Sequence, residues 1–265
     1  MNASQRPAHL AQLYESYEQA RAEFALELAG VFQSRSGLTS WEGVRVLDLG
    51  CGSGGIAAAF ARLGADVTGI EYDAVRVSKL AGSSLSFKLI AGDGHHLPFK
   101  ENCFHFVVLA DVLEHVYDPA QMMREVARVL CPRGMAFVGA TNRTSIVNLL
   151  FDPHYNAPLI PLMSKKTATF YVTRLLRFSN SFNVEKYFFR SELVSCLETS
   201  GFACQELPLY ADKLKKANLA DAPGRGLVKK LLGNALIRSC AIRWADTRAF
   251  NYLVAPGFNF LCTRL

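Results

Sequence analysis

Pairs of closely spaced cysteines are missing from this chain of 265 residues. Its seven cysteines include no C-x-x-C pair and no metal-ligand spacing, which argues against a zinc centre or a disulfide framework. No apolar run near the start resembles a signal peptide, and no stretch is long and apolar enough to span a bilayer. These absences predict a cytoplasmic protein. The length suffices for one α/β domain with insertions and a sizeable core.

The most informative stretch that is present couples an apolar segment to a glycine loop. The sequence VLDLGCGSGG occupies residues 46–55, and its apolar start is typical of a strand buried on both faces. The loop that follows contains Gly50, Gly52 and Gly54. Glycines allow a tight turn and close ligand approach. Residues 56–63 then predict a helix whose first N–H groups face a ligand, an architecture that binds nucleotide-like cofactors.

Two cofactors compete for this loop, and Asp48 decides between them. Gly50, Gly52 and Gly55 satisfy the G-x-G-x-x-G pattern of NAD-binding proteins, which alone is a weak signal. A carboxylate just before the first glycine repels a pyrophosphate but attracts the ammonium and sulfonium groups of S-adenosylmethionine (SAM). The loop therefore predicts SAM in preference to NAD.

Acidic residues farther along the chain agree with this choice. Residues 65–70 predict a second strand that ends at Glu71, where a carboxylate accepts hydrogen bonds from both ribose hydroxyls. A third strand at residues 85–90 leads to Asp93, which is expected at the adenine amino group, unless it only forms an Asx turn with its own backbone. The expected cofactor contacts are Asp48, Gly50, Cys51, Gly52, Gly54, Glu71, Tyr72, Gly92, Asp93, Gly94 and Ala110.

Four segments then carry a family resemblance. They read VLDLGCGSGGIAAAFARLGADVTGIEYD, GDGHHLPF, FHFVVLADVLEHVYDP and EVARVLCPRGMAFVGATNR, and together they span residues 46–143. They look like successive motifs of class I SAM-dependent methyltransferases, and they are most similar to ubiquinone-pathway O-methyltransferases and related small-molecule methyltransferases. The resemblance implies an α/β, Rossmann-like, seven-stranded and mostly parallel sheet with helices on both faces. It indicates the acceptor only weakly.

The predicted domain organisation has an N-terminal helical cap, a core domain and two insertions. Residues 1–40 form the cap, with a helix over residues 8–32, and residues 41–265 form the SAM-binding domain. A strand is expected at residues 104–110, followed by a helix with Asp118 as N-cap and Pro119 at its first position, ending near Pro132. The later core elements are predicted at residues 135–140, 191–200, 203–209 and 258–263.

The first insertion, residues 141–190, is rich in aromatic and basic side chains. It holds nine of the chain's 27 Phe and Tyr residues, and seven Lys or Arg residues against two acids. Its place after the fifth strand predicts a roof over the ligand crevice, suited to a planar or anionic acceptor. A small helical subdomain with its own core explains the same composition equally well.

The second insertion, residues 211–250, has a charge balance of +6, which equals the net charge of the whole chain. Apolar residues between 227 and 236 recur at helical spacing beside Lys229, Lys230 and Arg238, which predicts a basic amphipathic helix. Its apolar face either packs on the domain or lies in an anionic membrane surface.

A hydroxyl acceptor has to lose a proton, so histidines are candidate bases. His154 and His115 are the catalytic candidates, and His95, His96 and His105 have structural explanations. Asp111, Glu114 and His115 resemble the E-x-x-E-H pattern with which some relatives hold a divalent ion. Because Asp replaces the first Glu of this pattern, we expect that no metal is bound here. We expect instead that Glu114 and His115 form hydrogen bonds with the backbone.

These features predict a methyltransferase that acts on a hydroxyl of a small or carrier-linked metabolite. The chain lacks the Asn/Asp-Pro-Pro-Tyr segment of enzymes that methylate exocyclic amines of nucleic acid, so nucleic acid is an unlikely partner. An envelope-glycan or lipid-linked acceptor at the membrane surface is one alternative. A SAM-binding regulator without catalysis is another, because fold alone does not determine function.

Overall fold

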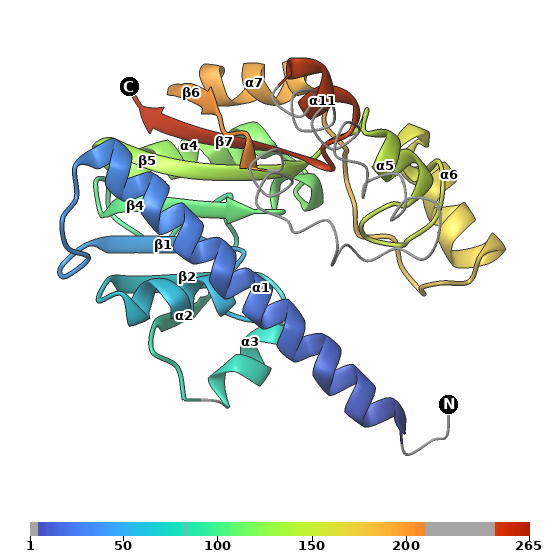
Figure 1. The fold of residues 1–265 in the computed structure, drawn as a ribbon, viewed down its shortest axis with the longest axis horizontal. Helices are drawn as coiled ribbons and strands as arrows, with labels where there is room; N and C mark the ends of the chain where they lie inside the picture. The colour runs from blue at the N-terminus through green and yellow to red at the C-terminus, as the bar shows by residue number, and fades with distance from the viewer. Residues whose placement is uncertain (1–4, 83, 210–246) are drawn as a thin grey trace, which may run out of the picture.

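The computed structural model describes residues 5–82, 84–209 and 247–265. Within these ranges seven strands form one sheet in the order β3-β2-β1-β4-β5-β7-β6 (Figure 1). The strands are β1 (Arg45–Leu49), β2 (Asp66–Glu71), β3 (Lys88–Ala91), β4 (Phe104–Ala110), β5 (Leu130–Thr141), β6 (Phe202–Glu206) and β7 (Gly257–Arg264). Only β7 runs antiparallel to its neighbours, β5 and β6. The predicted α/β class with a seven-stranded, mostly parallel sheet is confirmed.

Helices and short turns connect and cover the strands. They are α1 (Gln5–Ser36), α2 (Gly55–Arg62), α3 (Ala74–Ala81), η1 (Leu113–His115), α4 (Pro119–Val129), α5 (Ile146–Leu150), η2 (Ile160–Leu162), α6 (Lys165–Phe170), the π-helical turn η3 (Tyr171–Leu175), α7 (Arg190–Thr199) and α11 (Arg248–Leu253). None of the helices in the described ranges combines the length and hydrophobicity needed to cross a lipid bilayer.

Two hydrophobic layers bury the two faces of the sheet. In β4, Val107 and Leu109 belong to the cluster that includes α4 and α7, whereas Phe106 and Val108 belong to the cluster that includes α1 and α2. Successive side chains of a strand point to opposite faces, so a strand covered on both sides must be apolar throughout. The apolar run of β1 therefore reflects burial on both sides.

Helix boundaries follow local hydrogen bonds. The predicted N-cap of α4 is confirmed, because the Asp118 side chain accepts from the Gln121 N–H and Pro119 occupies the first turn. The helix ends at Val129, earlier than the predicted Pro132. The carbonyls of Arg128 and Val129 accept from the N–H groups of Asn102 and Cys103, so they are not available to continue the helix.

The helix α3 was absent from the sequence-based assignment. None of its side chains is buried. Its apolar residues Val77, Leu80 and Ala81 do recur at helical spacing, a signal that the sequence-based assignment missed. Its start is nevertheless capped, because the Asp73 side chain accepts from the N–H groups of Val75 and Arg76.

The insertion after β5 packs a hydrophobic cluster of its own. The buried members of this cluster are Ala157, Ile160, Ala168, Val172, Phe182, Val184 and Tyr187. This agrees with the interpretation of residues 141–190 as a small helical subdomain. Figure 1 shows α5 and α6 on the side of the molecule where the parallel strands end. Most of the second insertion, including Lys229, Lys230 and Arg238, lies outside the described residues.

Candidate active site

The glycine loop lies at the carboxyl end of β1. Gly50 and Gly54 have positive φ angles of 74° and 84°. A Cβ atom at Gly50 would lie 2.7 Å from Val112 Cγ2, and one at Gly54 would lie 2.7 Å from Phe87 Cζ. Glycine is thus required both for the backbone conformation and for the close approach of neighbouring chains. The loop therefore meets the segment after β4 directly.

Asp48 is buried below this loop and is only 2% exposed. Its Oδ2 accepts a hydrogen bond of 3.0 Å from the Ala57 N–H in the first turn of α2. Burial raises the pKa of Asp48 to about 7, although Arg21 and the Ala57 N–H oppose the shift. The carboxyl group is therefore balanced between its neutral and charged forms near neutral pH.

Glu71 connects the loop to the end of β2. Its Oε2 accepts from the Gly52 N–H at 2.8 Å and its Oε1 accepts from the Asp73 N–H at 2.9 Å. Each carboxylate oxygen has a second lone pair, so both can accept a further hydrogen bond from a ligand. The following residue, Tyr72, is 79% exposed. Cys51 is buried, and its N–H donates to the carbonyl of Ile70 in β2.

Residues 92–95 form the loop after β3. Asp93 Oδ1 accepts from the His95 N–H at 2.9 Å, which is the Asx turn expected as the alternative to adenine binding. The same oxygen lies 2.6 Å from His95 Nδ1, and the buried His95 ring stacks on Tyr117. Gly92 and Gly94 flank Asp93 in this loop. An adenine contact for these residues stays a prediction.

At the end of β4, α1 contributes a residue that sequence reasoning missed. The Arg21 guanidinium lies 3.3 Å from Asp111 Oδ2 and 3.5 Å from the carbonyl oxygen of Ala110. Arg21 and Asp111 are 90 positions apart, and no local pattern connects them. Their contact brings the N-terminal helix to the edge of the site.

Glu114 is fully buried in the turn η1. Its Oε1 accepts from the Thr141 N–H at 3.2 Å and from Thr141 Oγ1 at 2.5 Å. The first of these is the hydrogen bond to backbone that the sequence predicted for Glu114. Oε2 is buried without a hydrogen-bond partner among the described residues. Burial raises the pKa of Glu114, and the nearby Asp111 carboxylate raises it further. An unpartnered buried oxygen is costly and indicates a place for a ligand atom or a proton.

His154 lies on the loop after α5, above Asp152. Asp152 is buried and accepts from the N–H groups of His154 and Tyr155 and from the Tyr187 hydroxyl. His154 Nδ1 is 3.9 Å from Asp152 Oδ1, too far for a hydrogen bond, and has no partner among the described residues. Burial lowers the pKa of His154, but the carboxylates of Asp152 and Glu114 outweigh burial and raise the pKa above its usual value.

His115 is exposed and its tautomer follows from one contact. Its Nδ1 lies 2.8 Å from the carbonyl oxygen of Asn183. A carbonyl oxygen only accepts, so Nδ1 carries the proton and Nε2 of the neutral ring is a free acceptor. Two residues after Asn183, the N–H of Glu185 donates a hydrogen bond of 2.7 Å to the Glu114 carbonyl.

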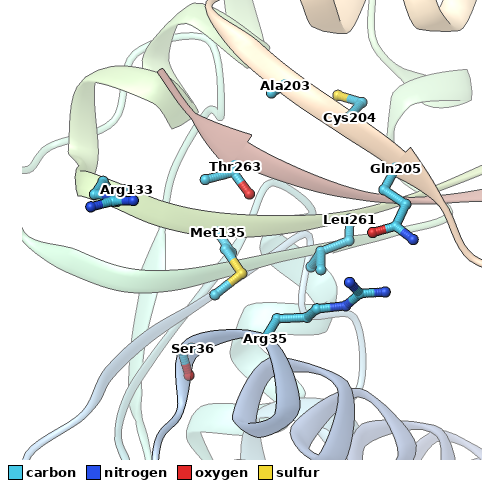
Figure 2. Close-up of a pocket in the computed structure, with 9 residues that line it drawn as sticks. All are labelled: Arg35, Ser36, Arg133, Met135, Ala203, Cys204, Gln205, Leu261 and Thr263. Atoms are coloured by element: carbon cyan, nitrogen blue, oxygen red, sulfur yellow. The ribbon is translucent and has the colours of Figure 1, made fainter.

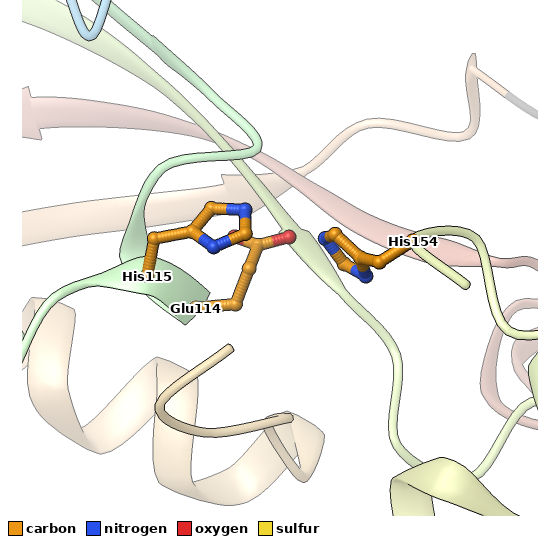
Figure 3. Close-up of side chains that lie close together, drawn as sticks. All are labelled: Glu114, His115 and His154. Atoms are coloured by element: carbon orange, nitrogen blue, oxygen red, sulfur yellow. The ribbon is translucent and has the colours of Figure 1, made fainter. Parts of the chain in front are cut away.

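Glu114, His115 and His154 converge in space. One donor atom from each residue lies within 4.8 Å of the other two. Figure 3 shows the Glu114 carboxylate directed toward the His154 ring, with His115 beside it. The ring centroids of His115 and His154 are 5.0 Å apart. Asp111, the first residue of the predicted D-x-x-E-H pattern, does not belong to this group and contacts Arg21 instead.

A cavity of about 640 Å³ lies elsewhere, at the opposite end of β5. Arg35 and Ser36 at the end of α1 line it, together with Met135, Gln205 and Leu261 from the sheet (Figure 2). None of the predicted site residues lines this cavity. It is separate from the glycine loop and from the three converging side chains.

Comparison with known proteins identifies the segment that carries the glycine loop. The family model described as a methyltransferase domain matches residues 47–138, the part of the chain that carries the glycine loop, Glu71, Asp93 and Glu114. These residues are a methyltransferase domain. The cofactor of this domain is SAM, as the sequence predicted.

Curated relatives of the methyltransferase domain share one name. Ubiquinone biosynthesis O-methyltransferase from Xanthomonas oryzae is 37% identical over 126 residues, which is 45% of this chain and 53% of the relative. The protein of the same name from Bordetella avium is 32% identical over 151 residues, covering 53% of this chain and 58% of the relative. The chain thus spans little more than half the length of these relatives.

Solved structures share the fold at low sequence identity. A SAM-dependent methyltransferase from Methanosarcina mazei is 20% identical, with a TM-score of 0.52 over 84% of this chain and 93% of its own. The [4+2]-cyclase SpnF is also 20% identical, with a TM-score of 0.50 over 90% of this chain and 80% of its own. The same fold therefore occurs in proteins named for different reactions.

Proposed function

We propose that this chain transfers the methyl group of SAM to a hydroxyl group of a small or carrier-linked acceptor. The methyltransferase domain at residues 47–138 and the shared name of the curated relatives support this proposal. The observation that carries the choice of a hydroxyl is the convergence of Glu114, His115 and His154, because a hydroxyl acceptor needs a proton acceptor close by.

The residues of the glycine loop fit the cofactor. No side chain caps α2 at Gly54, and the Ala57 N–H donates to Asp48, so the N–H groups of Gly55 and Ile56 would be the ones that face a ligand. Glu71 would bind the ribose hydroxyls, and Asp48 would attract the positive charges of SAM. When bound, SAM supplies an activated methyl group. The protein then contributes alignment of the acceptor and exclusion of water.

We infer that the two histidines accept the proton of the acceptor hydroxyl. His154 Nδ1 is buried without a partner, and the Asp152 carboxylate 3.9 Å away stabilises the ring once it is protonated. His115 offers a free Nε2 because its Nδ1 donates to Asn183. The third side chain, Glu114, has a buried Oε2 with no hydrogen-bond partner among the described residues, and its carboxylate lies close enough to the two histidines to contact the same acceptor group.

The same three side chains form a donor set that a divalent cation could use. We propose that the reaction does not depend on such an ion. Glu114 Oε1 already accepts two hydrogen bonds from Thr141, and burial disfavours the charged carboxylate that a metal requires. Asp111, the first acid of the D-x-x-E-H pattern, forms an ion pair with Arg21 instead of joining this donor set.

The insertion at residues 141–190 is proposed to roof the acceptor site, and the segment at residues 1–40, which contains α1, is proposed to cap the cofactor. The position of His154 beside η1 supports the first role. The contact of Arg21 with Asp111 supports the second. A lipid-linked acceptor is a second candidate, because large apolar side chains of α5 are exposed beside His154.

A turnover screen tests the proposal. The protein is incubated with SAM and pools of quinol, phenol, sugar and lipid-linked acceptors, and S-adenosylhomocysteine is measured. Turnover with a hydroxyl-bearing pool is the expected result, and the responding pool identifies the acceptor class. If SAM binds but no pool gives turnover, the result would favour the alternative that the protein is a SAM-binding regulator without catalytic activity. Tighter binding of NADH than of SAM would overturn the cofactor as well.

A further inference from the structure

Strands β6 and β7 place two cysteines directly opposite each other. Cys204 on β6 and Cys262 on β7 are register partners in the antiparallel ladder, although they are 58 positions apart in the chain. Both are free thiols, and the Cys204 thiol donates a hydrogen bond of 2.8 Å to Cys262 Sγ. Because the sequence contains no C-x-x-C pair, this dithiol is created by the tertiary structure alone.

The position of the pair in the ladder suits a covalent link. The Leu207 N–H donates to the carbonyl of Asn259, its register partner, so these two residues form a hydrogen-bonded pair. Hydrogen-bonded and non-hydrogen-bonded pairs alternate along antiparallel strands, and Cys204 lies three residues before Leu207. Cys204 and Cys262 are therefore a non-hydrogen-bonded pair, in which the Cα atoms lie about 4.5 Å apart and the side chains approach closely. A disulfide bridges Cα separations of about 4.4–6.8 Å.

The two thiols differ in how far solvent reaches them. Cys262 belongs to the hydrophobic cluster that includes α4 and α7, and it is 0% exposed. Cys204 packs against the same cluster but is only half-buried. It lies on β6, which ends the sheet and has no further neighbouring strand in the described ranges. Burial also raises the pKa of Cys262, so this thiol stays protonated. A reagent in solution therefore meets Cys204 first.

We propose that Cys204 and Cys262 form a redox-active dithiol that is oxidised by disulfides of small thiols. The Cys204 thiolate attacks one sulfur of such a disulfide and forms a mixed disulfide. The other half leaves as a thiolate and takes up the proton that Cys204 lost. Cys262 then attacks the Cys204 sulfur and expels the second half, which takes up the proton of Cys262. The two cysteines lose two electrons and two protons, and the external disulfide becomes two thiols.

The product is a disulfide that links β6 to β7 and that an excess of a small thiol reduces again by the reverse steps. The state of the pair therefore follows the ratio of disulfide to thiol in its surroundings. This site involves none of the residues proposed to bind SAM or to accept a proton, so it does not depend on the proposed methyl transfer.

Oxidation of the full chain in glutathione buffers tests the dithiol. The protein is equilibrated with mixtures of reduced glutathione and glutathione disulfide, and free thiols are then blocked with N-ethylmaleimide after an acid quench. Mass spectrometry of the intact chain and of its peptides locates the change. The parent should lose two hydrogens and yield a peptide pair linked through Cys204 and Cys262. Excess dithiothreitol should restore both thiols.

Single substitutions separate the two steps. Cys262→Ala should stop after the first step and keep one glutathione on Cys204. Cys204→Ala should leave Cys262 unmodified, because Cys262 is buried. The matched control combines Cys103→Ala with Cys131→Ala, which removes two other half-buried cysteines, and it should form the same link as the parent.

The measurement on the parent decides the proposal even if a variant does not fold. A parent that keeps both thiols at the highest proportion of glutathione disulfide would overturn it. Linked peptides that contain a different cysteine, or a glutathione adduct on Cys204 of the parent that never resolves into the link, would overturn it as well.

Discussion

Asp48 is a single carboxyl group whose charge responds to pH in the physiological range. It is completely buried, and burial is the main reason that its pKa is about 7. The neutral form suits the buried, desolvated position of Asp48, whereas the charged form suits a cationic ligand. Cofactor affinity and the protonation of this residue are therefore coupled.

The first prediction is a pH-dependent affinity for SAM. Below about pH 7 Asp48 is protonated in the unliganded protein. Binding must then displace that proton, so affinity should fall about tenfold per pH unit. Calorimetry between mildly acidic and mildly basic pH measures this slope. Asp48→Asn should bind weakly with no slope, and a slope that persists in this variant would assign the effect to another group.

The second prediction concerns Glu71. Glu71→Ala should weaken SAM binding by roughly ten- to a hundredfold, because charge-assisted hydrogen bonds worth about 1.5–3 kcal/mol are lost. Asp66→Ala, at the start of the same strand and paired with Lys88, serves as the matched control and should bind normally. An unchanged affinity for SAM in a folded Glu71→Ala protein would show that Glu71 does not contact the cofactor.

The third prediction is that His154→Ala lowers turnover roughly a hundredfold while SAM affinity stays nearly intact. In the parent, turnover should fall as pH drops through a value above the usual histidine pKa, because the pKa of His154 is raised and only the neutral ring accepts a proton. His96→Ala, at an exposed histidine, is the control. If turnover has the same pH profile in the parent and in His154→Ala, His154 does not accept the proton and serves only in packing.

At the scale of elements, the short turn η1 holds two of the three converging side chains in opposite environments. Glu114 points into the protein and His115 stays exposed, because adjacent positions of a tight turn face different directions. The segment at residues 183–186 then closes over the turn through the carbonyl of Glu114. The site thus depends on the turn and on the insertion together.

The fourth prediction tests this turn for a metal. Turnover should survive exhaustive chelation with EDTA, because Glu114 is engaged with Thr141 and Asp111 with Arg21. Loss of activity on chelation, with recovery on adding Mn²⁺ or Mg²⁺, would show that the donor set holds an ion. In that case Glu114→Ala should not respond to the added ion.

At the scale of the whole molecule, the candidate functions gather at one end of the sheet. The glycine loop, Glu71, η1 and the insertion all follow the carboxyl ends of parallel strands, where ligands bind in open α/β sheets. The 640 Å³ cavity lies at the other end. The helices α5 and α6 of the insertion lie at the same end as the glycine loop (Figure 1).

The sequence by itself determined the features that depend on neighbouring residues. The strand, the glycine loop and Asp48 are contiguous, and short continuous apolar runs predicted which segments are buried strands. The Asp118 N-cap was predictable for the same reason, since a cap needs only the next three residues. Local rules also led from the loop and Asp48 to SAM, and the position of Glu71 agreed with that choice.

Only the tertiary structure decided which distant side chains meet. His154 lies 39 positions beyond His115, and the path of the insertion determines that their rings approach each other. Arg21 reaches Asp111 because α1 packs across the sheet. In α5, hydrogen bonds from the Asn148 side chain to the carbonyls of Asn142 and Pro256 hold that side chain inward, and Ile146 and Leu150 are exposed. Each of these outcomes depends on contacts between segments far apart in the chain, which local periodicity does not encode.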